Sequence, residues 1–326
     1  MSALVEIRDL SVDILKGRGG GTKILPILRH IDLSVEKGQV LGLVGESGCG
    51  KTMTVLAILG LLPEGGQISS GQIFFQGRDL IKLPRREMEG LRGKRITMIF
   101  QEPMTSLNPL LSIGSQMREI LLQHEGLTGK ANRDKCISLL ETVNISEPEK
   151  IYDYYPFRLS GGMQQRVMIA MALACEPELI IADEPTTALD VTTQAQILDL
   201  FNEIRGRIRS SFIFVTHDLG VIAEIADRTS VIYSGYVVEE CSVAALFQMP
   251  LHPYTDGLMR SRMGRRNSNR DQLYSIPGTV PSPGNIPEGC PFAPRCQVVM
   301  ERCRREVPPL AEVQEGHRVR CWRQVF

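Results

Sequence analysis

The chain has 326 residues, of which 43% are hydrophobic and 23% charged, and its 37 Lys and Arg residues balance 37 Asp and Glu residues. This length and composition are those of a globular protein with one large domain, alone or with an appendage. The formal net charge of zero argues against a nucleic-acid partner bound through counterion release, although it leaves room for a local basic groove.

The sequence carries no signal for export or membrane insertion. No apolar run reaches the roughly 18 residues that a transmembrane helix needs. The first residues lack the basic and then apolar layout of a secretory signal. We therefore expect a cytoplasmic chain that reaches a membrane only through a protein partner.

The N-terminal part predicts strands that lead into a glycine-rich loop. Apolar residues alternate along residues 4–7, 10–14 and 31–35, as in half-buried strands. Residues 40–44 are continuously apolar, which indicates a strand buried on both faces. A glycine-rich segment follows, and the apolar residues 53–62 after it are numerous enough for a helix.

The middle of the chain predicts a helical insertion in an α/β core. A charged helix over residues 85–95 precedes a strand at 96–100. From about residue 103 to 158 the pattern changes, and residues 113–123 and 133–143 carry apolar side chains at helical spacing.

The last part of the core returns to strands, and a different texture follows. Strand signals at residues 179–182 and 212–215 flank a helix at 193–207, and this alternation favours a largely parallel sheet. Residues 260–270 are basic and polar, and residues 277–294 are dense in Pro and Gly. We interpret these as a linker and a compact, loop-rich tail.

The glycine-rich loop matches the phosphate-binding pattern G-x-x-x-x-G-K-[ST]. Its residues are Gly45, Glu46, Ser47, Gly48, Cys49, Gly50, Lys51 and Thr52. Glycines let backbone N–H groups converge on phosphates, Lys51 supplies a positive charge, and the Thr52 hydroxyl can bind Mg²⁺. A glycine-rich turn could match by accident, but the strand before it and the helix after it favour the functional reading. We interpret Cys49 as present for its backbone, although it is a possible point of oxidation.

A second acidic pair follows the strand at residues 179–182. Asp183 and Glu184 stand where α/β sheets bind ligands, at the carboxyl end of a buried strand. Asp183 can hold Mg²⁺ or its water, and Glu184 can polarise an attacking water. Adjacent acids can also simply cap a turn. The phosphate loop elsewhere in the chain favours the catalytic interpretation.

Between these motifs, residues 159–166 read Leu-Ser-Gly-Gly-Met-Gln-Gln-Arg and resemble the LSGGQ signature of ABC ATPases. Other landmarks of that family follow in order: Gln101 resembles the Q-loop glutamine, residues 188–190 the D-loop, and His217 the switch histidine. A lone Gln or His would mean little. Their order after successive strands makes the resemblance specific.

The resemblance implies a P-loop NTPase core of ABC type with a β subdomain and a helical insertion. Two ATPase subunits would enclose two ATP molecules head to tail. Ser160, Gly161 and Gly162 would then serve a nucleotide held mainly by the partner, with Asp190 in the adjoining D-loop. The remaining implied roles are Mg²⁺ binding by Thr52, Gln101 and Asp183, orientation of water by Glu184, and contact with the γ-phosphate by His217.

Several further segments are similar to the oligopeptide, dipeptide and nickel branch of ABC importers. They are residues 99–109, 183–192, 252–255, 277–281 and 289–296. The resemblance implies uptake of di- or oligopeptides, or of a related solute such as a nickel complex. It also implies a second, different ATPase subunit, two transmembrane permease subunits, an extracytoplasmic solute-binding protein and a peripheral place on the cytoplasmic face of the cell membrane.

The same resemblance divides the chain into an ATPase domain over residues 1–250, with a helical subdomain at about 103–175, and an extension over 251–326. One departure concerns adenine, which ABC ATPases usually stack on an N-terminal aromatic ring. No Phe, Tyr or Trp precedes Phe74, so Ile14 or Ile27 could take that place.

Other functions remain as alternatives. A soluble ABC ATPase acting on nucleic acid or ribosomes usually carries a long coiled-coil insertion or two ATPase units, and neither is present here. A degenerate regulatory subunit would not need intact Lys51, Asp183, Glu184 and His217. An exporter ATPase is often fused to membrane spans and lacks this C-terminal tail.

The tail holds four of the eight cysteines of the chain, Cys290, Cys296, Cys303 and Cys321, at spacings x₅, x₆ and x₁₇. A reduced compartment disfavours disulfides. Four thiolates in a segment too short for its own core suit Zn²⁺ or an iron–sulfur cluster, and the paired C-x₂-C of zinc ribbons is missing. The resemblance favours a [4Fe–4S] cluster over zinc or no metal. Six nearby arginines could offset thiolate charge or simply form a solvated surface: Arg295, Arg302, Arg304, Arg305, Arg318 and Arg320.

Overall fold

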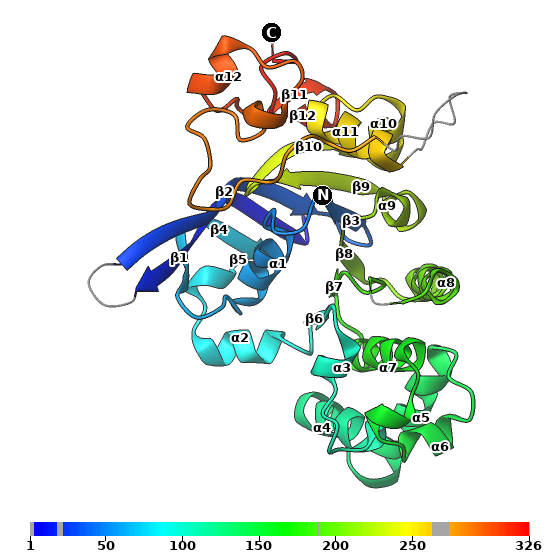
Figure 1. Cartoon of the computed structure of the whole chain (residues 1–326). Helices are drawn as coiled ribbons and strands as arrows, with labels where there is room; N and C mark the ends of the chain where they lie inside the picture. The colour runs from blue at the N-terminus through cyan, green and yellow to red at the C-terminus, as the bar shows by residue number, and fades with distance from the viewer. Residues whose placement is uncertain (1–2, 18–21, 188, 263–273, 326) are drawn as a thin grey trace, which may run out of the picture. The chain divides into compact units, whose positions relative to one another are not determined.

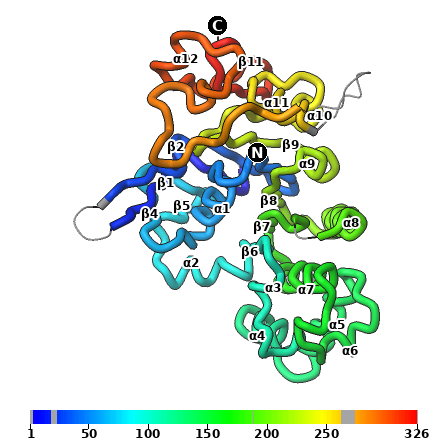
Figure 2. The backbone as a smooth tube through the Cα atoms, in the orientation of Figure 1, coloured from blue at the N-terminus to red at the C-terminus, as the bar shows by residue number. Residues whose placement is uncertain are grey.

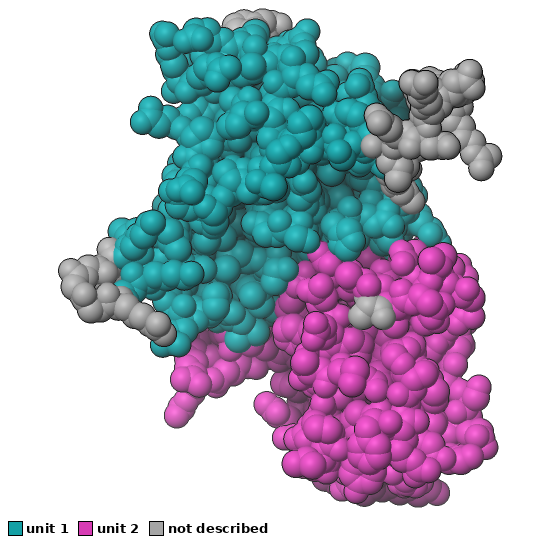
Figure 3. Space-filling model, in the orientation of Figure 1, with its two compact units in different colours: residues 1–82, 215–326 teal, residues 83–214 magenta. Residues whose placement is uncertain are grey.

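The computed structural model describes residues 3–17, 22–187, 189–262 and 274–325 (Figure 1 and Figure 2). The chain divides into two compact units, residues 1–82 with 215–326 (unit 1) and residues 83–214 (unit 2), which Figure 3 shows in different colours. Residues 18–21, Ala188 of the D-loop and most of the basic linker lie outside the described residues.

Unit 1 contains an antiparallel sheet made mostly from the N-terminal part of the chain. Its strands are β1 (Val5–Gly17), β2 (Thr22–Val35), β4 (Gly66–Phe75) and β5 (Arg78–Asp79), in the order β2-β1-β4-β5. The expected strands at residues 4–7 and 10–14 are one strand whose pairing register shifts between Ile7 and Leu10. Asp9 has a φ of 50° at this irregularity, so one long strand keeps both apolar stretches buried.

The remaining strands of unit 1 lie in the order β11-β12-β10-β9-β3. They are β3 (Val40–Val44), β9 (Arg228–Tyr233), β10 (Tyr236–Ser242), β11 (Ala311–Gln314) and β12 (His317–Val319). β3 pairs parallel with β9, whereas β9, β10, β12 and β11 pair antiparallel in turn. All of β3 is buried, as its continuous apolar run predicts.

The helices of unit 1 and its C-terminal segment share one hydrophobic core. The helices are α1 (Lys51–Leu59), α9 (Leu219–Ile225), α10 (Val243–Gln248), α11 (Pro253–Arg262) and α12 (Glu301–Arg305), with one-turn 3₁₀ helices η1 (Leu80–Lys82) and η3 (Ala293–Arg295). Phe292, Cys303 and Trp322 of the tail pack in the same cluster as Val44 and Tyr233 of the strands. The tail therefore has no separate core and is stabilised by the core of unit 1.

Unit 2 contains a short parallel sheet and a set of helices. Its elements are α2 (Arg85–Leu91), β6 (Ile96–Ile99), α3 (Pro103–Ser106), α4 (Ile113–Glu125), α5 (Gly129–Thr142), α6 (Pro148–Tyr152), η2 (Pro156–Arg158), α7 (Gly161–Leu173), β7 (Leu179–Asp183), α8 (Val191–Arg207) and β8 (Ser211–Thr216), whose last two residues enter unit 1. The strand order is β8-β7-β6, and β6 and β7 are parallel. The helices between β6 and β7 confirm the expected helical insertion. No helix among the described residues is long and apolar enough to cross a membrane.

Candidate nucleotide site

The predicted phosphate loop connects buried strand β3 to helix α1. Two glycines in it are required by their surroundings. A Cβ on Gly45 would lie 2.2 Å from the carbonyl oxygen of Ile232, and Gly50 has a φ of 110°, which side chains other than glycine rarely adopt. Ser47 and Gly48 are exposed, whereas Cys49 is buried. Burial raises the pKa of the Cys49 thiol, which supports the interpretation that it is structural.

The first turn of α1 is arranged to receive an anion. Gly50 precedes the helix, and no side chain caps its first N–H groups. The Lys51 ammonium donates hydrogen bonds to the carbonyl oxygens of Gly45 and Glu46 at 2.8 and 3.2 Å, so it lies folded over the loop. Thr52 is exposed at the second position of the helix. Backbone donors, the helix dipole and a lysine therefore converge at one point of unit 1.

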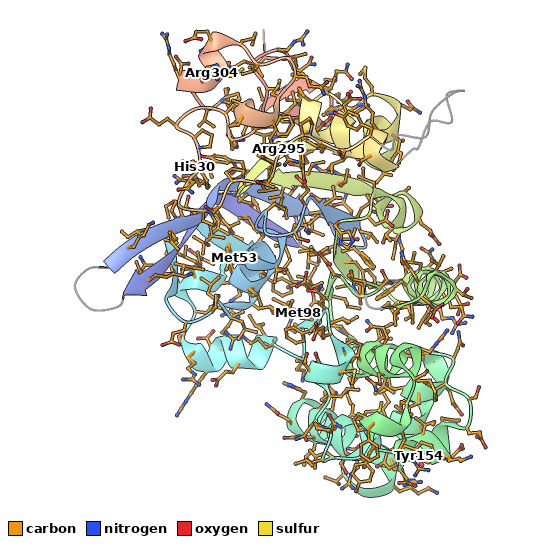
Figure 4. All side chains as sticks on the ribbon, viewed as in Figure 1. His30, Met53, Met98, Tyr154, Arg295 and Arg304 are labelled. Carbon is orange, nitrogen blue, oxygen red and sulfur yellow. The ribbon has the colours of Figure 1, made fainter. Side chains whose placement is uncertain are left out.

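The loop residue Glu46 is held by the C-terminal part of unit 1, which the sequence did not reveal. Its backbone N–H donates to the hydroxyl of Tyr254 at 2.8 Å. Its carboxylate forms a two-point ion pair with Arg295, with distances of 2.7 and 3.1 Å. Figure 4 labels Arg295 near strands β9 and β10, at the edge of the C-terminal segment. In the sequence, Tyr254 and Arg295 lie in the segments 252–255 and 289–296 that resemble the importer branch. That resemblance did not indicate a contact with Glu46.

In unit 2, Glu184 of the acidic pair is hydrogen-bonded to Gln101, the predicted Q-loop glutamine. Asp183 ends buried strand β7, and Glu184 follows with a φ of 47°, an uncommon conformation for a residue with a side chain. The Glu184 carboxylate accepts a hydrogen bond from the Gln101 amide at 3.3 Å and one from the Thr187 hydroxyl at 3.0 Å. The structure therefore brings together Gln101 and Glu184, which are 83 positions apart, and adds Thr187.

The signature segment of unit 2 forms a helix start. Ser160 caps α7 by accepting a hydrogen bond from the Met163 N–H at 3.3 Å. Gly161 and Gly162 form the first turn, and a Cβ on Gly162 would lie 2.6 Å from the Thr193 methyl group. Ser160 and Gly161 are exposed. These exposed donors at a helix N-terminus suit an anion supplied from outside unit 2.

Asp190 supports the same region from the neighbouring helix. Its carboxylate caps α8 by accepting hydrogen bonds from the Thr193 N–H at 3.0 Å and the Thr193 hydroxyl at 2.7 Å. These two hydrogen bonds, the hydroxyl first, lower the pKa of Asp190. Asp190 therefore fixes the residue against which Gly162 packs.

His217 follows strand β8 in unit 1 and is exposed. The next residue, Asp218, caps α9 by accepting a hydrogen bond from the Gly220 N–H at 2.7 Å. The phosphate loop and His217 thus belong to unit 1, whereas Gln101, the acidic pair, the signature and Asp190 belong to unit 2.

The two aliphatic candidates for an adenine contact lie on the N-terminal strands of unit 1. Ile14 on β1 and Ile27 on β2 are both half-buried. A Cβ on Gly50 would lie 3.6 Å from the carbonyl oxygen of Ile27, so the backbone of Ile27 is next to the phosphate loop. This position makes Ile27 the better placed of the two relative to the loop.

The four tail cysteines line one cavity, together with aromatic residues that include Phe292 and Trp322. The Cys290 N–H donates to the Cys303 carbonyl oxygen at 2.7 Å. Burial raises the pKa of Cys290 to about 12 and also raises those of Cys296 and Cys321. Burial therefore favours the protonated form of these three thiols, and a metal group would have to replace their protons.

The spacing of the sulfurs is wider than that of a single-ion site. Among the described residues, the only set of three Cys, His, Asp or Glu ligand atoms within 4.8 Å of one another belongs to Glu239, Cys241 and His317. A tetrahedral Zn²⁺ with bonds of about 2.3 Å would bring its sulfurs to about 3.8 Å. No three of the four tail sulfurs therefore lie as close together as the ligands of a single zinc ion. In the separate set of Glu239, Cys241 and His317, the Glu239 carboxylate is already engaged, because it accepts hydrogen bonds from the backbone N–H groups of Leu251 and His252.

Most of the tail arginines have partners of their own, and whether they also offset charge on the sulfurs stays a prediction. Arg302 pairs with Glu306, Arg305 with Glu301 and Arg318 with Glu240, while Arg320 donates to the carbonyl oxygens of Val237 and Pro308. Arg304, labelled in Figure 4, is exposed on α12. These groups stabilise the fold of the tail.

Comparison with known proteins gives two family matches. A model described as "ABC transporter" matches residues 28–187, and one described as "Oligopeptide/dipeptide transporter, C-terminal region" matches residues 238–303. The chain is 46% identical over 321 residues to a probable peptide ABC transporter ATP-binding protein of Sinorhizobium fredii, covering 98% of this chain and 95% of the relative.

Two relatives from Bacillus subtilis are equally similar. The oligopeptide transport ATP-binding protein AppD is 46% identical, with 99% of this chain and 97% of the relative covered. The dipeptide transport ATP-binding protein DppD is 47% identical, with 94% and 90% covered. Among solved structures, a dimeric ATP-binding cassette in a post-hydrolysis state with ADP and phosphate superposes with a TM-score of 0.64 at 26% identity, covering 73% of this chain and 98% of that one.

Proposed function

Because the chain belongs to the ATP-binding subunits of the oligopeptide/dipeptide family of ABC transporters and is an ATPase coupled to transport, we propose that its ATP hydrolysis drives the uptake of di- or oligopeptides. The likeness over nearly the whole chain, C-terminal region included, carries this proposal. It also disfavours the alternative of an ABC ATPase acting on nucleic acid or ribosomes.

The test is transport in vesicles that contain the permease subunits and this chain. ATP-dependent uptake of labelled dipeptides and longer peptides is expected when the matching solute-binding protein is added outside. A nickel complex serves as the competing solute. Uptake of that complex without uptake of any peptide would overturn the proposal, and identification of the copurifying solute-binding protein narrows the solute class.

We propose the following roles in ATP hydrolysis. Lys51 and the loop amides bind the β- and γ-phosphates, and Thr52, Gln101 and Asp183 hold Mg²⁺ or its water. Glu184 orients the water whose oxygen attacks the γ-phosphorus as the bond to ADP breaks. The contact between Gln101 and Glu184 supports a shared task. The full proposed set is Gly45, Glu46, Ser47, Gly48, Cys49, Gly50, Lys51, Thr52, Gln101, Asp183, Glu184 and His217.

The signature residues serve the partner's nucleotide in this proposal. Ser160, Gly161 and Gly162 present donors at an exposed helix start, and Asp190 supports them through Thr193. An ATPase of this family acts as a dimer and works with membrane permease subunits. We propose that its ATPase partner is a different, related subunit and that an extracytoplasmic solute-binding protein delivers the peptide.

Unit 2 also offers a surface for the permease subunits. Large apolar side chains are exposed at Met104 (78%), Leu110 (82%) and Phe157 (71%), and the Phe157 ring stacks on that of Tyr155 with centroids 5.6 Å apart. Exposed apolar side chains of this size favour a protein partner. We propose that they contact the permease, which would place the chain peripherally on the cytoplasmic face of the cell membrane.

We propose that residues 1–250 act as the ATPase domain, with its helical subdomain at about 103–175, and that residues 251–326 form an extension that holds a [4Fe–4S] cluster, with zinc as the alternative. Cys290, Cys296, Cys303 and Cys321 fit such a group because they line one cavity and no three of their sulfurs lie within 4.8 Å of one another, as one zinc ion would require. The cluster would supply four iron–sulfur bonds that fix the tail.

Anaerobic purification followed by iron, sulfide and zinc analysis tests the cluster. About four iron and four sulfide per chain, with broad visible absorption, are expected. Cys296→Ser should lose much of the iron, whereas Cys136→Ser, at a buried thiol in α5, should retain it. One zinc per chain without sulfide would replace the cluster by the alternative.

A further inference from the structure

The C-terminal segment of unit 1 contacts the phosphate loop through the buried guanidinium group of Arg295. The side chain of Arg295 is 4% exposed, and its donors reach Glu46, the carbonyl oxygens of Pro277 and Ile276, and the hydroxyl of Tyr233. The Glu46 bond lengths of 2.7 and 3.1 Å are those of a two-point charged pair. The pair joins positions that are 249 residues apart, so the sequence gives no local reason for it.

Arg295 is adjacent in sequence to the wall of the cysteine cavity, because Ala293 and Cys296 on either side of it line that cavity. It ends the short helix η3 and directly precedes Cys296, and Phe292 begins the same turn. Phe292 lines the cavity, and its ring lies 5.5 Å from that of Tyr254, the residue whose hydroxyl binds the Glu46 N–H. Two routes therefore lead from the cavity wall to Glu46, one through Arg295 and one through Phe292 and Tyr254.

We propose that Arg295 is a positioning residue that couples the four-cysteine segment to the phosphate loop, so that an ordered segment raises the affinity of the loop for MgATP. The physical reason is preorganisation. A loop whose Glu46 is already fixed loses less conformational freedom when phosphates bind. A group held by the cysteines fixes η3 and thereby the direction of the Arg295 side chain.

Coupling of this kind is reciprocal. If the ordered segment strengthens MgATP binding, MgATP must stabilise the ordered segment by the same factor. Bound nucleotide should therefore slow the chemical modification of Cys290 and Cys296, which do not belong to the phosphate loop. A residue that only stabilised the fold would not transmit this effect.

The first experiment measures MgATP affinity in the full-length chain by displacement of a fluorescent ATP analogue. Arg295→Gln is expected to weaken MgATP binding at least fivefold. Arg305→Gln is the matched control, because Arg305 lies in the same segment but is 73% exposed and pairs only with Glu301. Its affinity should stay within twofold of the original chain. Arg295→Lys keeps the charge but not the two-point geometry, so it should weaken binding less than Arg295→Gln.

The second experiment follows alkylation of individual cysteines by peptide mass spectrometry, with and without saturating MgATP. Saturation is checked for each variant, so weak binding cannot imitate lost coupling. In the original chain and in Arg305→Gln, MgATP should slow alkylation of Cys290 and Cys296 at least threefold. In Arg295→Gln this protection should disappear, while Cys49 in the phosphate loop stays protected directly by the nucleotide.

The outcomes separate this inference from the proposed function on which it rests. Absence of MgATP binding by the original chain would contradict the nucleotide site itself. Normal binding together with unchanged affinity in Arg295→Gln, or with equal protection of Cys290 and Cys296 in that variant, would overturn the coupling alone. If Arg295→Gln does not fold, the same comparison is made with Arg295→Lys, for which unchanged affinity and protection would equally overturn it.

Discussion

Two loops carry the proposed chemistry, and they differ in whether their supporting residues are distant or close in the chain. The phosphate loop at residues 45–50 depends on Tyr254 and Arg295, more than 200 positions further along the chain. The loop that begins at Glu184 depends on Thr187, three positions away, and on Gln101 at the end of the adjacent strand. One loop is thus positioned by the C-terminal segment, and the other by its own turn and sheet.

This difference predicts which changes affect each loop. A change in the tail should alter nucleotide affinity and the stability of unit 1 but leave the geometry of Glu184 intact. A change in the turn after β7 should alter hydrolysis and leave nucleotide affinity nearly unchanged. Four substitutions test whether the two loops respond separately in this way, and the first is expected to have the largest effect.

Glu184→Gln should abolish most hydrolysis while leaving MgATP binding intact. The amide has the same shape but cannot assist the attacking water as a base, a contribution typically of about 10²–10⁴-fold. Phosphate release by the assembled transporter measures the loss, and retention of ATP in the closed assembly measures binding. Hydrolysis at the original rate would contradict the role assigned to Glu184.

The sequence predicted the second loop more completely than the first. Strand β7 and its two acids follow from a local pattern, because a buried apolar strand and its final residues are adjacent in the chain, whereas Gln101 and the signature came from the resemblance to ABC ATPases. The contacts from Arg295 and Tyr254 to Glu46 could not be predicted, since nothing near Glu46 indicates partners more than 200 positions away. Strand β10 was missed for a related reason: it is buried as an inner strand, yet it includes Glu239 and Glu240, which break its apolar pattern.

Gly162→Ala tests whether the signature depends on its packing against the helix that follows the second loop. The added Cβ would lie 2.6 Å from the Thr193 methyl group, and such overpacking typically costs about 1–3 kcal/mol. We expect a lower thermal midpoint and slower hydrolysis in the assembled complex. Gly161→Ala is the control, because its Cβ would meet nothing closer than 3.7 Å and should not lower the midpoint. Equal destabilisation by both substitutions would show that the contact with Thr193 is not responsible.

Tyr254→Phe removes a distant support of the phosphate loop while keeping its ring. The Glu46 N–H loses its acceptor, and an unpaired group of this kind costs about 1–2 kcal/mol, which lowers the thermal midpoint by about 2–8 °C. Tyr155→Phe, at an exposed ring in unit 2, should change the midpoint little. If hydrolysis at saturating ATP fell more than MgATP affinity, Tyr254 would also support the second loop. The proposed separation of the two loops would then be wrong.

Thr187→Val should have the smallest effect and the most specific one. It removes the hydrogen bond from the Thr187 hydroxyl to the Glu184 carboxylate, while the Gln101 amide still donates one. One such hydrogen bond contributes about 0.5–1.5 kcal/mol, and the loss of that much transition-state stabilisation lowers the rate of phosphate release about two- to tenfold. Thr187→Ser keeps the hydroxyl and should restore most of the rate, which a defect in packing alone would not allow. Because the Thr187 hydroxyl binds Glu184 of the second loop, MgATP affinity should remain unchanged in both variants, and a matching loss of affinity would mean that the two loops share their supports.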